Sequence, residues 1–116
     1  MTLTALSLYT AASYANNVVV VNTTACQYTV VLNTIGPVTV NAFQTVTIPS
    51  PLLNATGAKV SWVGAAPSVY VEMLTFPSAT SATISVYPTC IPGGNPFLVT
   101  WNQANAAANV LMQISS

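Results

Sequence analysis

Four side chains of this 116-residue chain are the best candidates for chemistry: the two charged residues Lys59 and Glu72, and the thiols of Cys26 and Cys90. The chain contains no Arg, Asp or His. General acid–base catalysis needs positioned titratable groups, usually His or paired carboxylates. The Ser and Thr hydroxyls likewise have no neighbouring base to activate them. These absences predict a protein that is not an enzyme and needs no cofactor.

The spacing of Lys59 and Glu72 predicts that they face each other. If residues 64–67 form a four-residue hairpin loop, Lys59 lies opposite Glu72 on the adjacent strand. An exposed cross-strand ion pair of this kind contributes about 0.2–1 kcal/mol. A sharper alternative is an isopeptide bond, in which unprotonated Lys59 attacks an Asn carboxamide while a buried Glu72 carboxyl moves the protons. No motif identifies the Asn, so we favour the ion pair.

Two cysteines cannot supply the four ligands of a structural zinc site. The alternatives are a Cys26–Cys90 disulfide in an oxidising compartment or two buried thiols, and we favour the disulfide. Two sequons, Asn22-Thr23-Thr24 and Asn54-Ala55-Thr56, indicate the same compartment. Asn22 and Asn54 are therefore candidate acceptors of N-linked glycans.

The charge content restricts the partners of the chain. Only 2% of the residues are charged, against about a quarter in ordinary soluble domains. A nucleic-acid-binding protein must neutralise phosphates with several basic residues, so one lysine predicts no nucleic acid. Because charges normally keep domains apart in solution, their scarcity favours a structural protein whose partner is a second copy of itself.

The apolar residues are dispersed along the chain rather than concentrated in one segment. They make up 53% of the sequence and the mean hydropathy is +0.63. The longest purely aliphatic run is nevertheless only Val18 to Val21, far short of the about 20 residues of a spanning helix. We therefore expect no membrane span. Met1 to Ala15 lacks a basic start and an unbroken apolar core, so we expect it to belong to the mature chain.

Short runs of β-branched residues, separated by Pro, Gly, Asn and Ser, predict an all-β protein. Residues 16–116 are expected to form one domain, a single β-sandwich with Greek-key or jelly-roll connections. The phase of the run 38–48 changes around Asn41-Ala42, which indicates a bulge or bend. The predicted strands are 17–21, 26–33, 38–48, 58–63, 68–76, 82–87, 97–101 and 109–115.

Residues 1–15 are predicted to be an extended N-terminal arm and hinge. Leu3 and Ala5 alternate with Thr residues, and Leu6 and Leu8 continue on the opposite phase. Such a segment can add to the sheet of a neighbouring subunit as a donor strand, or it can be the first strand of its own sheet. The candidate donor strand consists of Thr2, Leu3, Thr4, Ala5, Leu6, Ser7, Leu8 and Tyr9.

The larger aromatic side chains are expected mainly in the core. Exposed, they could instead form the platform of a carbohydrate-binding module, which usually also has Asp, Arg or amide groups nearby. Only the amides are present in this chain. The residues concerned are Trp62, Tyr70, Phe76, Phe97 and Trp101.

A nearly charge-free β-domain rich in Thr, Val, Ala and Asn, with sequons and an apolar arm, resembles the extracellular pilus and thread subunits of hyperthermophilic archaea. The resemblance implies subunits joined head to tail by an N-terminal strand, here Thr2 to Tyr9, with glycans on Asn22 and Asn54. It departs from archaeal type IV pilins, because Met1 to Val21 contains no long apolar helix.

We therefore expect a subunit of an extracellular cell-surface filament assembled by strand exchange. The alternative is a structural protein of an archaeal virus, located in the capsid, turret or tail of the virion. A secreted carbohydrate-binding module is the third possibility.

Overall fold

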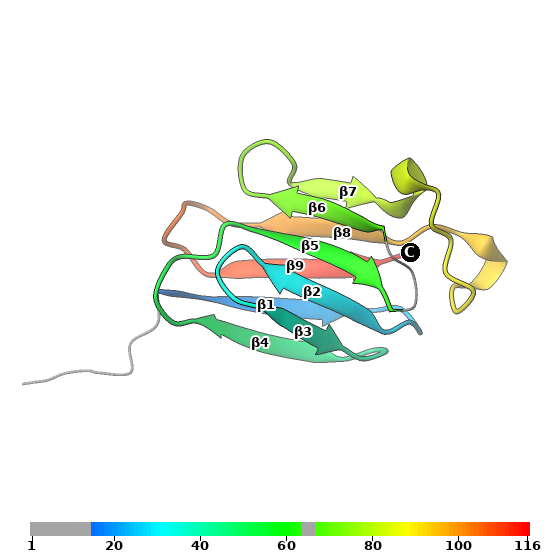
Figure 1. Cartoon of the computed structure of the whole chain (residues 1–116), viewed down its shortest axis with the longest axis horizontal. Coiled ribbons are helices and arrows are strands. Elements are labelled where there is room, and N and C mark those ends of the chain that lie inside the picture. The colour runs from blue at the N-terminus through cyan, green and yellow to red at the C-terminus, as the bar shows by residue number, and fades with distance from the viewer. Residues whose placement is uncertain (1–14, 64–66) are drawn as a thin grey trace, which may run out of the picture.

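The computed structural model describes residues 15–63 and 67–116, which fold into nine β-strands and two short 3₁₀ helices (Figure 1). The candidate donor strand Thr2 to Tyr9 lies outside the described residues. The strands are β1 (Asn16–Asn22), β2 (Tyr28–Leu32), β3 (Pro37–Val40), β4 (Thr45–Ser50), β5 (Gly57–Trp62), β6 (Ser68–Glu72), β7 (Ser78–Thr80), β8 (Leu98–Asn102) and β9 (Val110–Ser115). The helices are η2 (Ser81–Ile84) and η3 (Pro92–Gly94).

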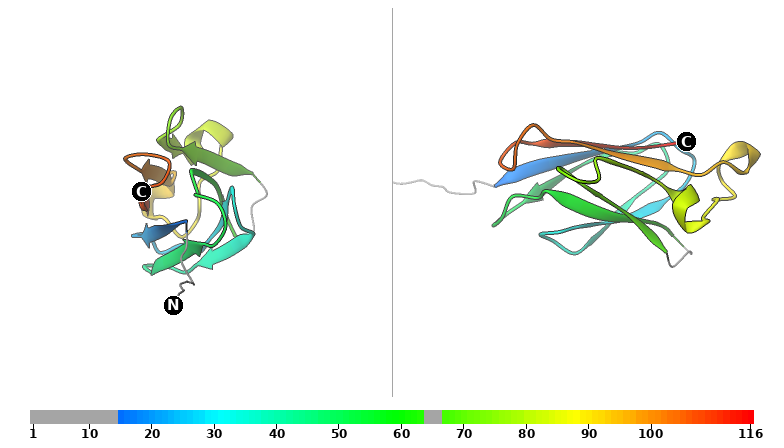
Figure 2. Two further views of the ribbon diagram at one scale, coloured as in Figure 1. Left: turned by 90° about the vertical axis from the view of Figure 1, so that its left-hand side faces the viewer. Right: turned by 90° about the horizontal axis from the view of Figure 1, so that it is seen from above.

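The strands form two sheets, which confirms the all-β prediction. One sheet has five strands in the order β4-β1-β9-β8-β7, and the other has four in the order β3-β2-β5-β6. β1 and β9 are parallel, and the other pairs are antiparallel. The sheets lie in two layers (Figure 2). The described residues contain no helix long and apolar enough to cross a membrane.

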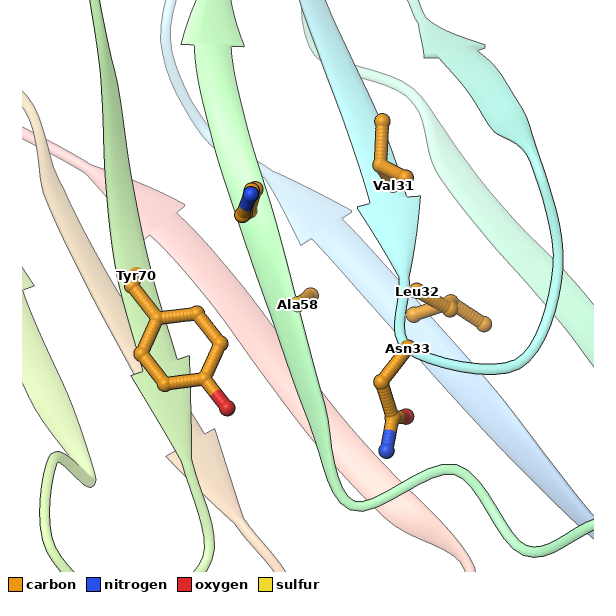
Figure 3. Close-up of a pocket in the computed structure, with 6 residues that line it drawn as sticks. Val31, Leu32, Asn33, Ala58 and Tyr70 are labelled. Carbon is orange, nitrogen blue, oxygen red and sulfur yellow. The ribbon is translucent and has the colours of Figure 1, made fainter.

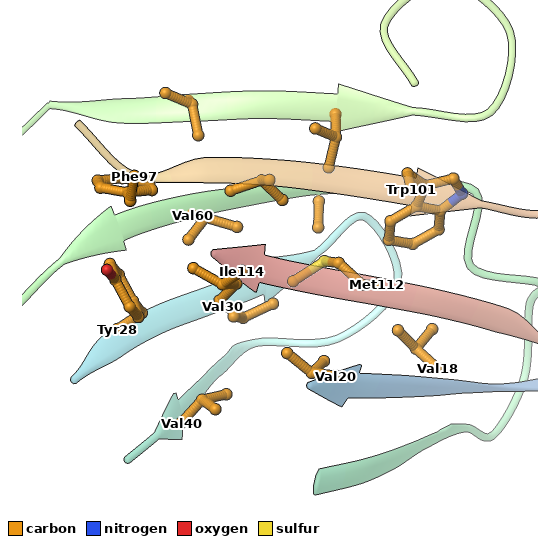
Figure 4. Close-up of a cluster of buried hydrophobic side chains, with 14 of the residues drawn as sticks. Val18, Val20, Tyr28, Val30, Val40, Val60, Phe97, Trp101, Met112 and Ile114 are labelled. Carbon is orange, nitrogen blue, oxygen red and sulfur yellow. The ribbon is translucent and has the colours of Figure 1, made fainter. Parts of the chain in front are cut away.

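One hydrophobic cluster receives side chains from both sheets (Figure 4). Burial alternates along the strands: Val18 and Val20 of β1 are fully buried, as are Val30 and Val60 of the other sheet. This alternation follows from the period of two in a β-strand. The ring of Tyr28 on β2 contacts Phe97, which precedes β8, with 4.9 Å between ring centroids. The predicted apolar face of residues 28, 30 and 32 is therefore part of the core.

The run predicted as one strand over 38–48 is two strands in different sheets. β3 ends at Val40, β4 begins at Thr45, and Phe43 between them has a positive φ of 57°. The turn is closed by the Gln44 N–H, which donates to Asn41 O at 3.1 Å. The change of phase at Asn41-Ala42 thus marked a crossing between sheets, not a bulge within one strand.

The strand predicted over 82–87 is replaced by η2 and an irregular segment. Thr80 Oγ1 accepts from the Ala82 N–H at 3.2 Å, and Ser81 Oγ donates to Val86 O at 2.6 Å. Ser85 then adopts a left-handed conformation with φ of 58°. Hydroxyl groups that bond to nearby backbone compete with sheet formation, and here they outweigh the β-propensity of the segment.

Candidate assembly surface

The two charged side chains do not face each other. β5 and β6 pair with Lys59 opposite Tyr70 and Glu72 opposite Gly57. The predicted Lys59–Glu72 ion pair is therefore wrong. The β5–β6 pair nearest the loop is Ser61 with Ser68, so the connection between the strands is longer than the four-residue loop that the prediction assumed. The displacement is two residues, so Lys59 and Glu72 still lie on the same face of the sheet, as diagonal neighbours.

Glu72 instead stabilises a turn. Its Oε1 accepts from the backbone N–H of Leu74 at 3.0 Å and from that of Thr75. Its own N–H donates to Phe76 O at 2.8 Å. The bond from Thr75 is the main reason that the pKa of Glu72 is lowered. A carboxylate held ionised at the surface cannot serve the isopeptide chemistry considered above, which requires a buried, protonated carboxyl.

The five aromatic residues considered as a binding platform divide between core and surface. Phe97 and Trp101 are in the core, and Trp62 is half-buried. Tyr70 and Phe76 are exposed and pack edge to face, with ring centroids 6.3 Å apart. Only this last pair could contact a ligand.

A hollow of about 220 Å³ lies beside Tyr70 on the outer face of the four-stranded sheet (Figure 3). The amide of Asn33, on its wall, is already bonded to Thr56, since Oδ1 accepts from Thr56 N–H and Nδ2 donates to Thr56 Oγ1, each at 3.1 Å. The groups that remain for a ligand are the ring of Tyr70, the ammonium group of Lys59 and the second hydrogen and lone pair of the Asn33 amide. This gives little support to a carbohydrate-binding module. The hollow is lined by Val31, Leu32, Asn33, Ala58, Lys59 and Tyr70.

The sequon asparagines have different environments. Asn22 is 2% exposed, and its Nδ2 donates to Cys26 O at 2.7 Å and to Asn41 O at 2.9 Å. A glycan on Asn22 would have to replace one of these hydrogens, so it would cost one of the two hydrogen bonds. Asn54 is half-buried in the loop before β5, with its Oδ1 buried and without a hydrogen-bond partner in the described residues. Of the two sequon asparagines, Asn54 is the candidate acceptor whose Nδ2 is not committed to such a pair of bonds within the described part of the chain.

The predicted disulfide is confirmed: Cys26 and Cys90 are bonded. The bond ties the segment between η2 and β8 to the residues that precede β2. No group of three or more potential metal ligands occurs in ranges 15–63 and 67–116.

In the described part of the chain each sheet ends in two edge strands, and three of the four carry a feature that restricts strand addition. Unprotected edges pair with other strands, and proteins usually block them with charges, prolines or short strands. β7 has three residues. β3 has four and begins with Pro37, which has no N–H. On β6, the Glu72 N–H is already donated to Phe76 O.

β4 is the longest edge strand, with six residues, and its free side keeps several backbone groups. The Asn22 N–H donates to Gln44 O at 3.0 Å, which sets the phase of the β1–β4 ladder. Because ladder bonds alternate, Thr45 and Thr47 direct their N–H and C=O groups away from β1. Pro49 has the same orientation, as is typical of prolines on an edge.

Between β3 and β4 the core is incompletely covered. We define the β3–β4 seam as three half-buried side chains that pack against the core, Ile35, Val38 and Val46. Val38 and Val46 are two residues from Val40 and Ile48, which are 0% and 4% exposed, so all four point inward. Among the described elements, β3 makes extensive contact only with β2, and β4 only with β1.

On the opposite side of the molecule, the inner face of β6 is covered, although Ala79 of β7 and Ile84 of η2 are half-buried. The inward-facing residues of β6, Val69 and Val71, are 4% and 0% exposed. β6 contacts β7, β8 and η2. Within residues 15–63 and 67–116, the seam therefore differs from β6 in that its inward-facing valines are only half-buried.

Searches for related proteins found no match among family models, curated proteins or solved structures.

Proposed function

We propose that this protein is a structural subunit that polymerises into an extracellular filament by exchanging β-strands between copies. The described residues form the acceptor, a β-sandwich, and Thr2 to Tyr9 of a neighbouring copy form the donor strand. The observation that carries the proposal is the β3–β4 seam, where inward-facing Val38 and Val46 remain half-buried beside a strand with free backbone groups. An added strand would bury the two valines and also form hydrogen bonds with the free backbone groups of β4.

The charge content supports contact between copies. With one lysine and one acidic residue, no large single-sign field opposes the approach of identical surfaces. The Cys26–Cys90 disulfide supports an oxidising location outside the cytosol.

A filament is favoured over the shell of a virion by the type of contact. A donor segment and an acceptor edge are different surfaces, and such heterologous contacts generate open filaments unless a rotation closes them into a ring. A closed or tail-like particle is the alternative outcome that imaging distinguishes.

The test compares the full chain with a variant lacking residues 1–10 and with a second variant in which those residues are replaced by a Gly/Ser segment of equal length. We expect filaments from the full chain by electron microscopy, and folded monomers with an unchanged circular dichroism spectrum from both variants. Normal filaments from either variant would refute the proposal, as would a full chain that stays monomeric at millimolar concentration.

A further inference from the structure

We infer that the acceptor surface is the β3–β4 seam and that Leu6 and Leu8 of a second copy cover Val38 and Val46. The inference rests on the proposed function and adds the identity of the edge and the register of the donor.

The seam is bounded at both ends. At one end the Thr34 and Ser50 hydroxyls are hydrogen-bonded at 2.7 Å. At the other end the chain passes from β3 to β4, and the Phe43 N–H donates to Thr24 O at 3.0 Å. Between these ends the seam is about as long as β3, whose four residues span roughly 13 Å at 3.3 Å each. A strand laid along it turns about two side chains inward.

The arm contains a matching pair of side chains. Leu6 and Leu8 are two residues apart, so they point to the same face of an extended strand. The other phase offers Leu3 and the smaller Ala5. Two leucines cover more of the apolar surface than a leucine and an alanine, and the hydrophobic gain scales with the area removed from water. In this register Ser7 points outward.

The backbone of β4 can bind such a strand. Thr45 and Thr47 direct their N–H and C=O groups toward the free edge, and their side chains are exposed on the outer face. A donor strand that pairs with them extends the five-stranded sheet by one strand. Its outward Ser7 then lies near Thr47.

A second copy provides the donor more readily than the same chain does. The Ala15 N–H donates to Ser50 O at 2.9 Å, so the chain enters β1 beside the last residue of β4. Five residues separate Tyr9 from Ala15, so the Cα atoms of these two residues lie at most about 22 Å apart. To reach its own seam the chain would have to reverse within that length around the loop that carries Leu52, which is 88% exposed. The arm of a neighbour requires no reversal.

The experiment uses full-length chains in two populations, one carrying Ser7→Cys and the other Thr47→Cys, with the native disulfide intact. The populations are mixed, allowed to assemble and oxidised mildly, and the cross-linked peptides are identified by mass spectrometry. Ser78→Cys on β7 and Ser68→Cys on β6 are matched controls, because both positions are exposed on other edge strands. We expect the position-7 cysteine to bond to position 47 at least ten times more often than to either control.

Each other result overturns the inference. Bonding at position 68 or 78 instead, or assemblies without any cross-link, removes the seam as acceptor while leaving the proposed function intact. A bond formed within one dilute monomer of the Ser7→Cys/Thr47→Cys double variant shows that the arm pairs with its own sheet. Failure of unmodified chains to assemble refutes the proposed function itself.

A second measurement tests the register. Leu6→Ser/Leu8→Ser should raise the lowest concentration at which assemblies form by at least tenfold, while Leu3→Ser changes it less than threefold. The opposite ranking would overturn the assignment of Leu6 and Leu8.

Discussion

The two lateral sides of the molecule close the gap between the sheets in different ways. On the β6–β7 side, Val69 and Val71 are almost completely buried, and η2 lies against β6. On the β3–β4 side, Val38 and Val46 have the same side chain and the same inward orientation but are only half-buried. The difference therefore comes from what lies next to the strands, not from the strands themselves.

The comparison shows how a chain almost without charges protects its sheet edges from pairing with other strands. Charged residues are the commonest protection for an edge, and only Glu72 acts at one here, through the turn that follows β6. The other protections are Pro37 on β3, the shortness of β7, and η2 beside β6, while Pro49 restricts only the end of β4. Among residues 15–63 and 67–116, no equivalent segment covers the seam.

The largest expected effect is loss of the disulfide. Replacing both cysteines, Cys26→Ala/Cys90→Ala, should lower the free energy of unfolding by about 4 kcal/mol, because the bond closes a long loop. Amide hydrogen exchange should increase more in β6 than in β4, since the released segment directly follows η2, which contacts β6. Thr89→Ala, an exposed neighbour of Cys90, is the control and should change neither quantity. Equal loss of protection in β4 and β6 would contradict the distinction between the two sides.

The next largest effect comes from shortening one valine to alanine on each side of the molecule and comparing the loss of unfolding free energy. In the chain lacking residues 1–10, Val71→Ala should cost about 2 kcal/mol through lost burial and a cavity. Val46→Ala should cost less than about 1 kcal/mol, because that side chain is already half-exposed. Urea unfolding measures both values. Equal costs would show that the seam is as well packed as the β6–β7 side.

The smallest effect concerns acid. Because the folded-state pKa of Glu72 lies below its ordinary value near 4.5, its contribution is present above the unfolded-state pKa and is lost as pH falls through the folded-state pKa. The melting temperature should therefore fall by only a few degrees between about pH 5 and pH 2. Glu72→Gln should abolish this dependence.

Lys59→Gln is the matched control for the acid experiment. It should leave the dependence unchanged, because Glu72 is bonded to its own turn and Lys59 lies opposite Tyr70. If Lys59→Gln removed the dependence as fully as Glu72→Gln, the two charges would be partners after all.

Alternation in the sequence was sufficient to predict one apolar strand face of the core. Tyr28, Val30 and Leu32 share one phase, and all three are buried. The position of the turn at Asn41-Ala42 was also visible as a change of phase. These features depend on local geometry, which a sequence pattern reports directly.

Features that depend on partners distant in sequence were not predictable in the same way. The predicted register of β5 and β6 depended on an assumed loop length. That register was wrong by two residues, so the predicted pairing of Lys59 with Glu72 was wrong as well. The sequon at Asn22 gave no sign that its amide is buried and bonded to Cys26 and Asn41. The seam has no sequence signature, because Val38 and Val46 resemble any inward-facing residues until their neighbours are known.

The pairing of β1 with β4 determines how such an assembly would bear mechanical tension. Each subunit would be pulled at β4, where it holds a neighbour's arm, and at β1, which continues into its own arm. These two strands are adjacent and antiparallel over six rungs, so the pulling force would pass across one ladder and largely bypass the rest of the domain. The ladder would be loaded along the strand direction, so its hydrogen bonds would have to fail together rather than one after another.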